Sequence, residues 1–222
     1  IYNDIRITLF INNYLFSVII TTAWLILIIN AFNLLDNMDG LSAGVAFISG
    51  IIFFFLSVQT NQWIIAFLFI GLLGALLGFL CYNFPPASIF MGDSGSLFVG
   101  YMMGVLTVHT TFYQTTSIYP IALPILVLAV PLFDTLTVIW IRISMGSSIL
   151  KADKRHFSHR LLNLGMTSPQ ALLIIYLLTL ICGLSSILLY QIDLFGAVII
   201  LIQMFLLLTL LHILEQSANN KK

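Results

Sequence analysis

The sequence predicts an all-α, polytopic membrane protein with about seven transmembrane helices, and its composition and recurring apolar runs carry this prediction. Hydrophobic residues make up 60% of the 222 and charged residues 7%, whereas a soluble domain carries roughly a quarter charged residues. The mean hydropathy is +1.11. Apolar runs approach roughly 20 residues, the length that a helix needs to cross the hydrocarbon. Eight basic and eight acidic residues cancel, so net charge does not indicate a nucleic acid as a partner.

The apolar runs occur in a regular order with polar connections between them. The expected spans are 14–32, 42–58, 62–82, 95–113, 118–141, 170–190 and 194–214. Seven of the eight basic residues fall on the side of the longer connections, and only Arg6 falls on the other. The positive-inside rule therefore predicts that residues 83–96, residues 142–170 and the carboxyl terminus are cytoplasmic.

Small residues recur every fourth position on two of the expected spans, and we interpret them as contacts between helices. They are Ser96, Gly100 and Gly104 on the fourth span, and Gly74 and Gly78 on the third. The cysteines Cys81 and Cys182 both lie inside apolar runs and have no ligand-like neighbours. We interpret them as packing residues rather than as a disulfide or a metal pair.

The first polar stretch, residues 30–41, lies between the first two spans and reads NAFNLLDNMDGL. Carboxylates at the edge of a bilayer are expensive to hold and tend to mark a substrate or ion site. Asn30 and Asn33 are three apart, as are Asp36 and Asp39, and this spacing predicts that each pair stacks on one side of a helical turn. The alternative is a polar helix end that caps the next helix.

The second polar stretch, residues 83–96, ends the third span and opens the fourth. Its Pro85-Pro86 pair stops a helix, and its GDSGS sequence is expected to start one with backbone amides directed at the cytoplasm. Such a start can receive a phosphate, while the Asp93 carboxylate could take a hard metal ion that bridges to the same phosphate. The alternative is that Asp93 is only an N-cap residue.

The third polar stretch is the connection 142–170, which contains KADKRHFSHR at residues 151–160. Two histidines three apart resemble half of a zinc site, but the surrounding basic residues would repel a cation. A diphosphate is the better guest for lysine, arginine and imidazole groups. The alternative is a basic patch that touches anionic lipid.

Together these stretches indicate phosphoryl transfer at a membrane surface. In this chemistry the protein positions the groups and neutralises charge, and a divalent metal bridges phosphate oxygens. No serine or cysteine nucleophile paired with a base is evident, and none is needed if an acceptor phosphate attacks directly.

Four motifs in this order resemble the polyprenyl-phosphate N-acetylhexosamine-1-phosphate transferases, a match that runs from about Tyr14 to the carboxyl terminus. They are residues 30–41, 90–96, 131–135 and 153–160. The resemblance implies an enzyme that moves a sugar-1-phosphate from a UDP-sugar to a polyprenyl phosphate such as undecaprenyl phosphate. It implies release of UMP, use of Mg²⁺ or alternatively Mn²⁺, and the first membrane step of cell-envelope polysaccharide synthesis. The expected location is the bacterial cytoplasmic (inner) membrane, with the active site on the cytoplasmic face.

The resemblance also implies roles for individual residues. Catalytic roles fall on Asp36, Asp39, Asp93, His156 and His159, with Asp93 as the metal ligand. Substrate-binding roles fall on Asn33, Phe90, Arg160 and Asp134, with Phe90 as the ring that stacks on uracil. Asp134 matches a recurrent family acid, for which we expect a role in orienting a partner in the cytoplasmic loop.

The chain departs from the family pattern in three places. A common family form has a histidine where Ser158 stands and a glycine where Asn37 stands. The family also has two adjacent aspartates on an earlier loop, and this chain has no Asp-Asp pair and no initial methionine. We therefore expect a single transmembrane domain over 1–222 that is the carboxyl-terminal portion of an enzyme, lacks its amino-terminal spans and is inactive alone.

The choice of sugar rests on the third polar stretch. The loop reads His-Phe-Ser-His-Arg and lacks the three consecutive histidines of the branch that uses UDP-MurNAc-pentapeptide, so we expect UDP-GlcNAc. The alternative function is a non-catalytic membrane protein, either a transporter or a degenerate relative that only binds lipid phosphate. The resemblance leaves a homodimer open.

Overall fold

The computed structural model describes residues 14–110, 122–146, 156–189, 192 and 194–219, and every regular element within these ranges is a helix. The chain divides into two compact units, Ile1–Tyr113 and Gln114–Lys222. The acidic motifs lie in the first unit and the described part of the basic stretch lies in the second. Each unit therefore carries a polar motif of its own.

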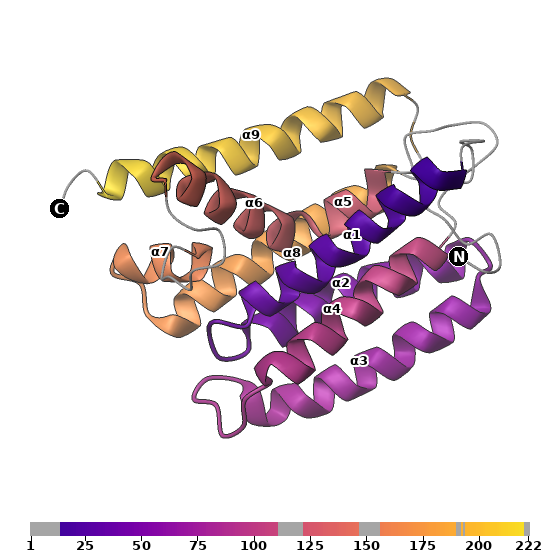
Figure 1. The fold of residues 1–222 in the computed structure, drawn as a ribbon, viewed down its shortest axis with the longest axis horizontal. Coiled ribbons are helices and arrows are strands. Elements are labelled where there is room, and N and C mark those ends of the chain that lie inside the picture. The colour runs from indigo at the N-terminus through magenta and orange to yellow at the C-terminus, as the bar shows by residue number, and fades with distance from the viewer. Residues whose placement is uncertain (1–13, 111–121, 147–155, 190–191, 193, 220–222) are drawn as a thin grey trace. The chain divides into compact units, whose positions relative to one another are not determined.

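Residues 14–110, the described part of the first unit, form four long helices (Figure 1). They are α1 (Tyr14–Leu35), α2 (Leu41–Gln59), α3 (Trp63–Asn83) and α4 (Gly92–His109). The most extensive packing joins α1 to α4 and α2 to α3. The turn between α1 and α2 depends on Gly40, whose φ of 73° lies in the left-handed region that other residues rarely adopt.

Helices α1 and α4 run antiparallel and approach closely. The indole Nε1 of Trp24 donates a hydrogen bond of 3.0 Å to Oγ1 of Thr107 at one end of the pair. A Cβ atom at Gly100 would stand 2.8 Å from the Cα atom of Ile29, and one at Gly104 would stand 3.1 Å from a methyl of Leu25. The predicted packing role of these two glycines is confirmed, because Gly100 lies against the α1 backbone and Gly104 lies against the side chains of Leu25 and Ile28.

The same prediction is wrong for the third helix. A Cβ atom at Gly74 or Gly78 would meet no atom of the described chain within 4 Å. Both positions lie on the exposed side of α3, so spacing alone did not distinguish a contact face from an outward one. Cys182 is buried as expected, whereas Cys81 is exposed, and both are free thiols.

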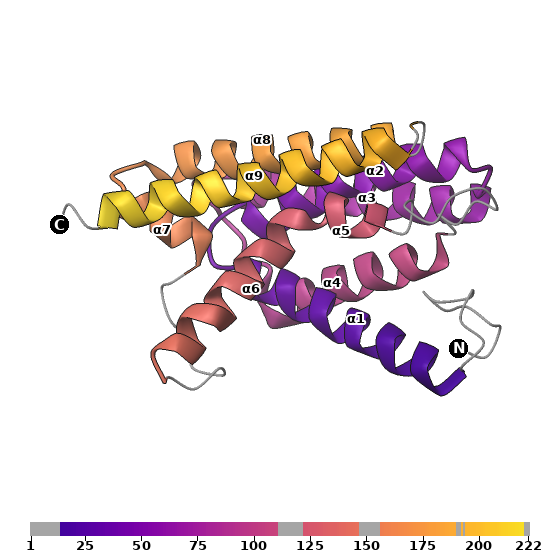
Figure 2. The ribbon, with the colours of Figure 1, turned by 90° about the horizontal axis from the view of Figure 1, so that it is seen from above.

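The described residues of the second unit form two short and three longer helices. They are α5 (Leu123–Val127), α6 (Ala129–Ser144), α7 (Phe157–Asn163), α8 (Ser168–Leu189) and α9 (Leu194–Asn219). Helix α8 contacts the other four and runs beside α9 (Figure 2). Its buried residues, among them Leu172, Ile175 and Cys182, form the core of this unit.

The expected span over 118–141 is not one continuous helix within its described part. The chain forms α5 and α6 there, with a turn at Leu128 between them. Pro131 has no N–H to donate to Val127, so the hydrogen-bond ladder cannot continue across this point. The proline instead sits in the first turn of α6, where a missing donor is tolerated.

Among the described residues, four helices are long and apolar enough to cross a membrane: α1, α2, α3 and α8. They coincide with four of the expected spans. Helix α4 occupies the position of another expected span but is not among the four, and the described apolar part of α9 is the shorter stretch Leu194–Thr209. The all-helical membrane architecture is thus confirmed, and the count of seven spans stays a prediction.

Candidate functional site

Asn33 joins the end of α1 to the start of α4. Its Nδ2 donates one hydrogen bond of 3.1 Å to Oδ1 of Asp93 and another of 3.0 Å to Oγ of Ser96. The antiparallel packing of α1 and α4 produces this arrangement, because it places the last turn of one helix beside the first turn of the other. The amide orients the Asp93 carboxylate, which is exposed to ligands.

Asp36 lies in the turn that follows α1, close to the same carboxylate. Burial raises the pKa of Asp36 above its ordinary value, the backbone N–H of Gly92 opposes this change, and the charge of nearby Asp93 raises the pKa further. Two like charges are held near each other in a half-buried setting, which favours a bound cation between them. We call Asn33, Asp36 and Asp93 the acidic cluster.

A second set of contacts ties the loop after α1 to the loop after α3. The backbone N–H of Ala87 donates to Oδ2 of Asp39 at 3.1 Å. Asn83 accepts from the backbone N–H of Gly40 at 3.0 Å and donates to the carbonyl of Ile89 at 2.8 Å. Asn83 is 4% exposed, so both ends of its amide are used inside the protein. It holds together the two loops that flank the acidic cluster.

Sequence reasoning assigned no role to Asn83. Its position could have indicated a role. Asn83 is an amide at the last residue of an apolar helix, two residues before a proline pair, where the local backbone offers it few hydrogen-bond partners. A buried polar side chain needs hydrogen bonds, and only the fold shows that one of them comes from Gly40, in the loop after α1.

Asn30 and Asn33 lie three apart within α1, as their spacing predicted, and Nδ2 of Asn30 donates to the carbonyl of Ile26 in the same helix. Two details of the sequence-based interpretation need correction. The pair Asp36 and Asp39 does not stack on a helical turn, because α1 ends at Leu35. The N-cap of α4 is Met91 without a side-chain cap bond, so Asp93 belongs to the first turn and is not a cap residue.

The aromatic ring at Phe90 lies directly before this helix start and is 77% exposed. A ring in that position is accessible to a planar base, which is what the predicted stacking requires. Asn37, at a family departure, donates from Nδ2 to the carbonyl of Leu34 at 2.7 Å and so closes the end of α1. This hydrogen bond gives the departure a structural explanation.

In the second unit, Asp134 of α6 meets the start of α7. The carboxylate contacts Nδ1 of His156 at 2.9 Å and accepts the backbone N–H of Phe157 at 2.6 Å. Asp134 is 1% exposed and His156 is 5% exposed, so the pair is interior. The expectation that Asp134 orients a partner in the loop agrees with this geometry.

The neighbouring residues of α7 carry the remaining basic groups. Nη2 of Arg160 donates to Oγ1 of Thr137 at 3.3 Å, and its guanidinium lies 5.8 Å from the centre of the Phe157 ring. His159 is partly exposed. We call His156, His159 and Arg160 the basic segment; residues 151–155 of the predicted motif lie outside the described residues.

A magnesium ion was expected at Asp93. Among the described residues no three histidine, cysteine or acidic side chains gather into a metal site. Mg²⁺ does not need such a cage, because it usually binds one or two carboxylates and completes its shell with water and substrate phosphates. Asp36 and Asp93 bring two carboxylates near each other at the cluster, which is a donor set of the kind that Mg²⁺ takes.

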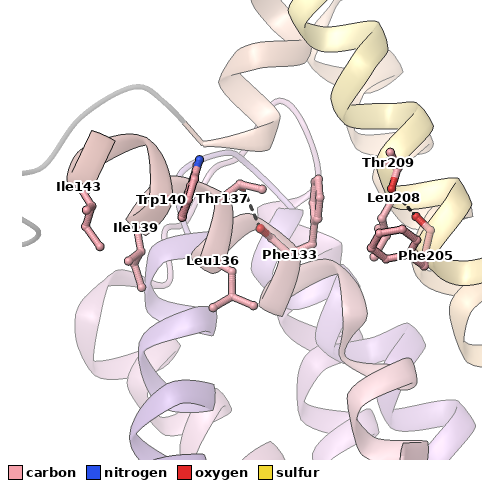
Figure 3. Close-up of a pocket in the computed structure, with 9 residues that line it drawn as sticks. All are labelled: Phe133, Leu136, Thr137, Ile139, Trp140, Ile143, Phe205, Leu208 and Thr209. Atoms are coloured by element: carbon pink, nitrogen blue, oxygen red, sulfur yellow. Dashed lines mark hydrogen bonds between the residues drawn. The ribbon is translucent and has the colours of Figure 1, made fainter. Parts of the chain in front are cut away.

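An apolar groove of about 560 Å³ lies between α6 and α9 (Figure 3). Its walls are formed by Phe133, Leu136, Thr137, Ile139, Trp140, Ile143, Phe205, Leu208 and Thr209. The two threonine hydroxyls donate to the carbonyls of Phe133 and Phe205 in their own helices. With its hydroxyls occupied in this way, the groove suits a hydrocarbon chain better than a sugar or a nucleotide.

The fold is that of a helical membrane protein with an acidic cluster in its first unit and a basic segment in its second. Residues 2–111 match the family model described as glycosyl transferase family 4, and over these residues the chain belongs to that family. The resemblance drawn from the motifs is thereby confirmed.

Curated relatives extend the similarity beyond these residues. The chain is 39% identical over 170 residues to the "Probable undecaprenyl-phosphate N-acetylglucosaminyl 1-phosphate transferase" of Bacillus subtilis, covering 77% of this chain and 47% of the relative. It is 37% identical to the decaprenyl-phosphate N-acetylglucosaminephosphotransferase of Mycolicibacterium smegmatis, covering 72% and 44%. It is 34% identical to the phospho-N-acetylmuramoyl-pentapeptide-transferase of Lactobacillus johnsonii, covering 68% and 46%. The chain spans about half the length of the curated relatives it matches.

Proposed function

We propose that the protein transfers a sugar-1-phosphate from a UDP-sugar to a polyprenyl phosphate. An oxygen of the acceptor phosphate attacks the phosphorus that carries the sugar, the bond from that phosphorus to the UMP oxygen breaks, and UMP leaves with the electron pair. The acidic cluster carries the proposal, because two carboxylates held close at a helix start match the needs of diphosphate chemistry.

Within this cluster, Asp93 and Asp36 would hold Mg²⁺ and Asn33 would orient Asp93. The ion, when bound, neutralises phosphate oxygens and the charge that develops on the leaving UMP. The backbone amides at the start of α4 add a partial positive charge toward the same phosphate. Phe90 supplies an exposed ring for the uracil base.

The basic segment supplies groups that bind phosphate in the same reaction. Arg160 can balance the charge of a diphosphate or of a lipid phosphate, and the two imidazoles can exchange a proton or a hydrogen bond with it. Thr137, which accepts a hydrogen bond from Arg160, also lines the apolar groove. This shared residue supports the groove as the place for the acceptor's prenyl chain, with its phosphate toward Arg160.

GlcNAc-1-phosphate is the proposed group transferred, with UDP-GlcNAc as donor. The N-acetylglucosamine relatives of Bacillus subtilis and Mycolicibacterium smegmatis are 39% and 37% identical to the chain, against 34% for the muramoyl-pentapeptide relative. The Escherichia coli relative named for N-acetylglucosamine is 32% identical, so the proposal of the sugar rests chiefly on the His-Phe-Ser-His-Arg loop. The proposed location is the bacterial inner membrane with the acidic cluster at the cytoplasmic face, supported by the split of basic residues.

The experiment is a transfer assay with the complete protein that the gene encodes. Purified protein in detergent receives UDP-GlcNAc labelled in the sugar, undecaprenyl phosphate and Mg²⁺, and labelled lipid is counted. The expected result is labelled lipid with equimolar UMP, lost on addition of EDTA. If neither labelled lipid nor UMP forms, with UDP-GlcNAc or with UDP-MurNAc-pentapeptide as donor, the proposal is refuted in favour of a non-catalytic membrane protein.

A second assay tests the apolar groove. Leu136→Asn should raise KM for undecaprenyl phosphate and leave KM for UDP-GlcNAc unchanged, because Leu136 lines the groove. Leu173→Asn is the matched control, since Leu173 is a similarly exposed leucine on α8 outside the groove. Equal effects of the two substitutions would remove the groove from the proposal.

A further inference from the structure

Helix α6 contacts the start of α7 through the side chain of Asp134. Asp134 accepts hydrogen bonds with both carboxylate oxygens, one from the ring of His156 and one from the backbone N–H of Phe157. His156 is the residue before α7 and Phe157 is its first residue. The carboxylate therefore holds a side chain and starts a helix at the same time.

The residues on either side of Asp134 add further contacts between α6 and α7. The ring of Phe133 meets the ring of Phe157 edge to face, with centres 6.0 Å apart and an angle of 86°. Thr137, one turn after Phe133, accepts the hydrogen bond from Arg160. Adjacent turns of α6 thus contact His156, Phe157 and Arg160, and the orientation of the basic segment is determined by α6.

The hydrogen bond to Asp134 selects one tautomer of His156. An ionised carboxylate can only accept, so the shared proton belongs to Nδ1 of the imidazole. Nε2 is then the ring nitrogen that can exchange a proton or a hydrogen bond with a ligand. A carboxylate as buried as Asp134 would be costly without these two donors, which argues that the arrangement is maintained as a unit.

We propose that Asp134 is a positioning residue for phosphate transfer: it holds His156 in the Nδ1–H tautomer and fixes the start of α7. Asp134 acts through His156 and does not itself touch substrate. The inference rests on the proposed function, because it assigns the basic segment to the handling of phosphate. It predicts that the charge of Asp134 matters less than its ability to accept a hydrogen bond from Nδ1.

The test is Asp134→Asn in the complete protein. The asparagine carbonyl can still accept from Phe157, but its amide group now donates to Nδ1 and forces the proton of His156 onto Nε2. In protein labelled with ¹⁵N-histidine, the His156 signals should change from the Nδ1–H to the Nε2–H pattern. The value of kcat should fall by about 10- to 100-fold, as for other residues that orient a functional histidine, with KM for UDP-GlcNAc little changed.

Two further variants make the result specific. Asp134→Asn placed in a His156→Gln background should cause no additional loss, because both changes remove the same function. Asp134→Glu restores an acceptor and should return His156 to the Nδ1–H tautomer, which also serves if the asparagine variant does not purify. Thr137→Val is the matched control on α6 and should leave the tautomer unchanged.

Failure of the inference and failure of the proposed function are distinguishable. If the unaltered protein transfers no sugar phosphate to any acceptor, the function fails and the inference falls with it. If the unaltered protein is active but His156 keeps its tautomer in Asp134→Asn, the inference alone is overturned. The inference is also overturned if the double variant loses the product of the two single decreases in kcat, because the two residues would then act independently.

Discussion

Asn33 and Asp93 are 60 positions apart in the chain, and a hydrogen bond of 3.1 Å joins their side chains. The bond connects the last turn of α1 to the first turn of α4, and a second bond from the same amide to Ser96 stabilises it. It turns two ordinary helix ends into one polar cluster, and the first three predictions below test this cluster and the packing beneath it.

Asp93→Asn should abolish transfer and leave the fold intact. The asparagine carbonyl can still accept from Asn33, so the link between α1 and α4 survives while the charge that holds the metal is lost. Loss of several kcal/mol of transition-state stabilisation corresponds to about a thousandfold decrease in rate. Single-turnover assays and the melting temperature in detergent measure the two parts. Ser94→Ala, an exposed change in the same turn, is the control. Activity near that of the unaltered protein would exclude Asp93 as the metal ligand.

Asp36→Asn should raise the stability of the protein without metal. Because burial and the charge of Asp93 raise the pKa of Asp36, the folded state disfavours its ionised form. The contribution of this carboxyl to the free energy of unfolding is therefore fully present below its unfolded pKa of about 3.9. That contribution is lost as pH rises through the raised pKa of the folded state. The melting-temperature gain of Asp36→Asn in EDTA should grow with pH across that window and then level off.

Two comparisons accompany this prediction. Asp39→Asn should give no gain, because the Asp39 carboxylate accepts a hydrogen bond from Ala87. Adding Mg²⁺ should stabilise the unaltered protein more than Asp36→Asn, since an ion that binds the folded state shifts the unfolding equilibrium. A gain that is absent at neutral pH, or that shrinks as pH rises, would contradict the assigned repulsion.

Gly100→Ala should destabilise the first unit and reduce activity together. The added methyl would meet the backbone of Ile29 at 2.8 Å, so α1 and α4 must separate. Overpacking of this kind costs about 1–3 kcal/mol, and the separation should lengthen the Asn33–Asp93 hydrogen bond. Gly74→Ala is the matched control, because its methyl meets nothing within 4 Å and alanine favours the helix. Thermal unfolding of both variants measures the difference, and equal melting temperatures would refute the close approach.

Asn83→Ala should loosen the two loops beside the acidic cluster. Removal of the amide deletes the hydrogen bonds that Asn83 makes to the N–H of Gly40 and to the carbonyl of Ile89, and the loss of the buried one to Gly40 should cost about 1–3 kcal/mol. Hydrogen exchange should increase at Gly40, and KM for the UDP-sugar should rise. Asn30→Ala is the control, since its amide bonds only to its own helix on an exposed face. Unchanged exchange at Gly40 would contradict the role of Asn83.

Much of the fold was predictable from local sequence. Apolar runs without internal proline predicted α1, α2, α3 and α8 within a few residues of their observed limits. The break at Leu128 was missed because the apolar run continues across it, although Pro131 marked the place. Hydropathy averages over side chains and is insensitive to one absent backbone donor.

The sequence by itself determined which chemical groups this protein has and which ends of its helices carry them. Asp36, Asp93, His156 and Arg160 could each be proposed for phosphate chemistry from residue type and family resemblance. Tertiary structure alone decided the partners: Asn33 for Asp93, Asn83 for Gly40, and Asp134 for His156. The physical reason is that these hydrogen bonds join residues from 22 to 60 positions apart. Each depends on how closely two helices or loops approach, which side-chain packing sets and local periodicity does not encode.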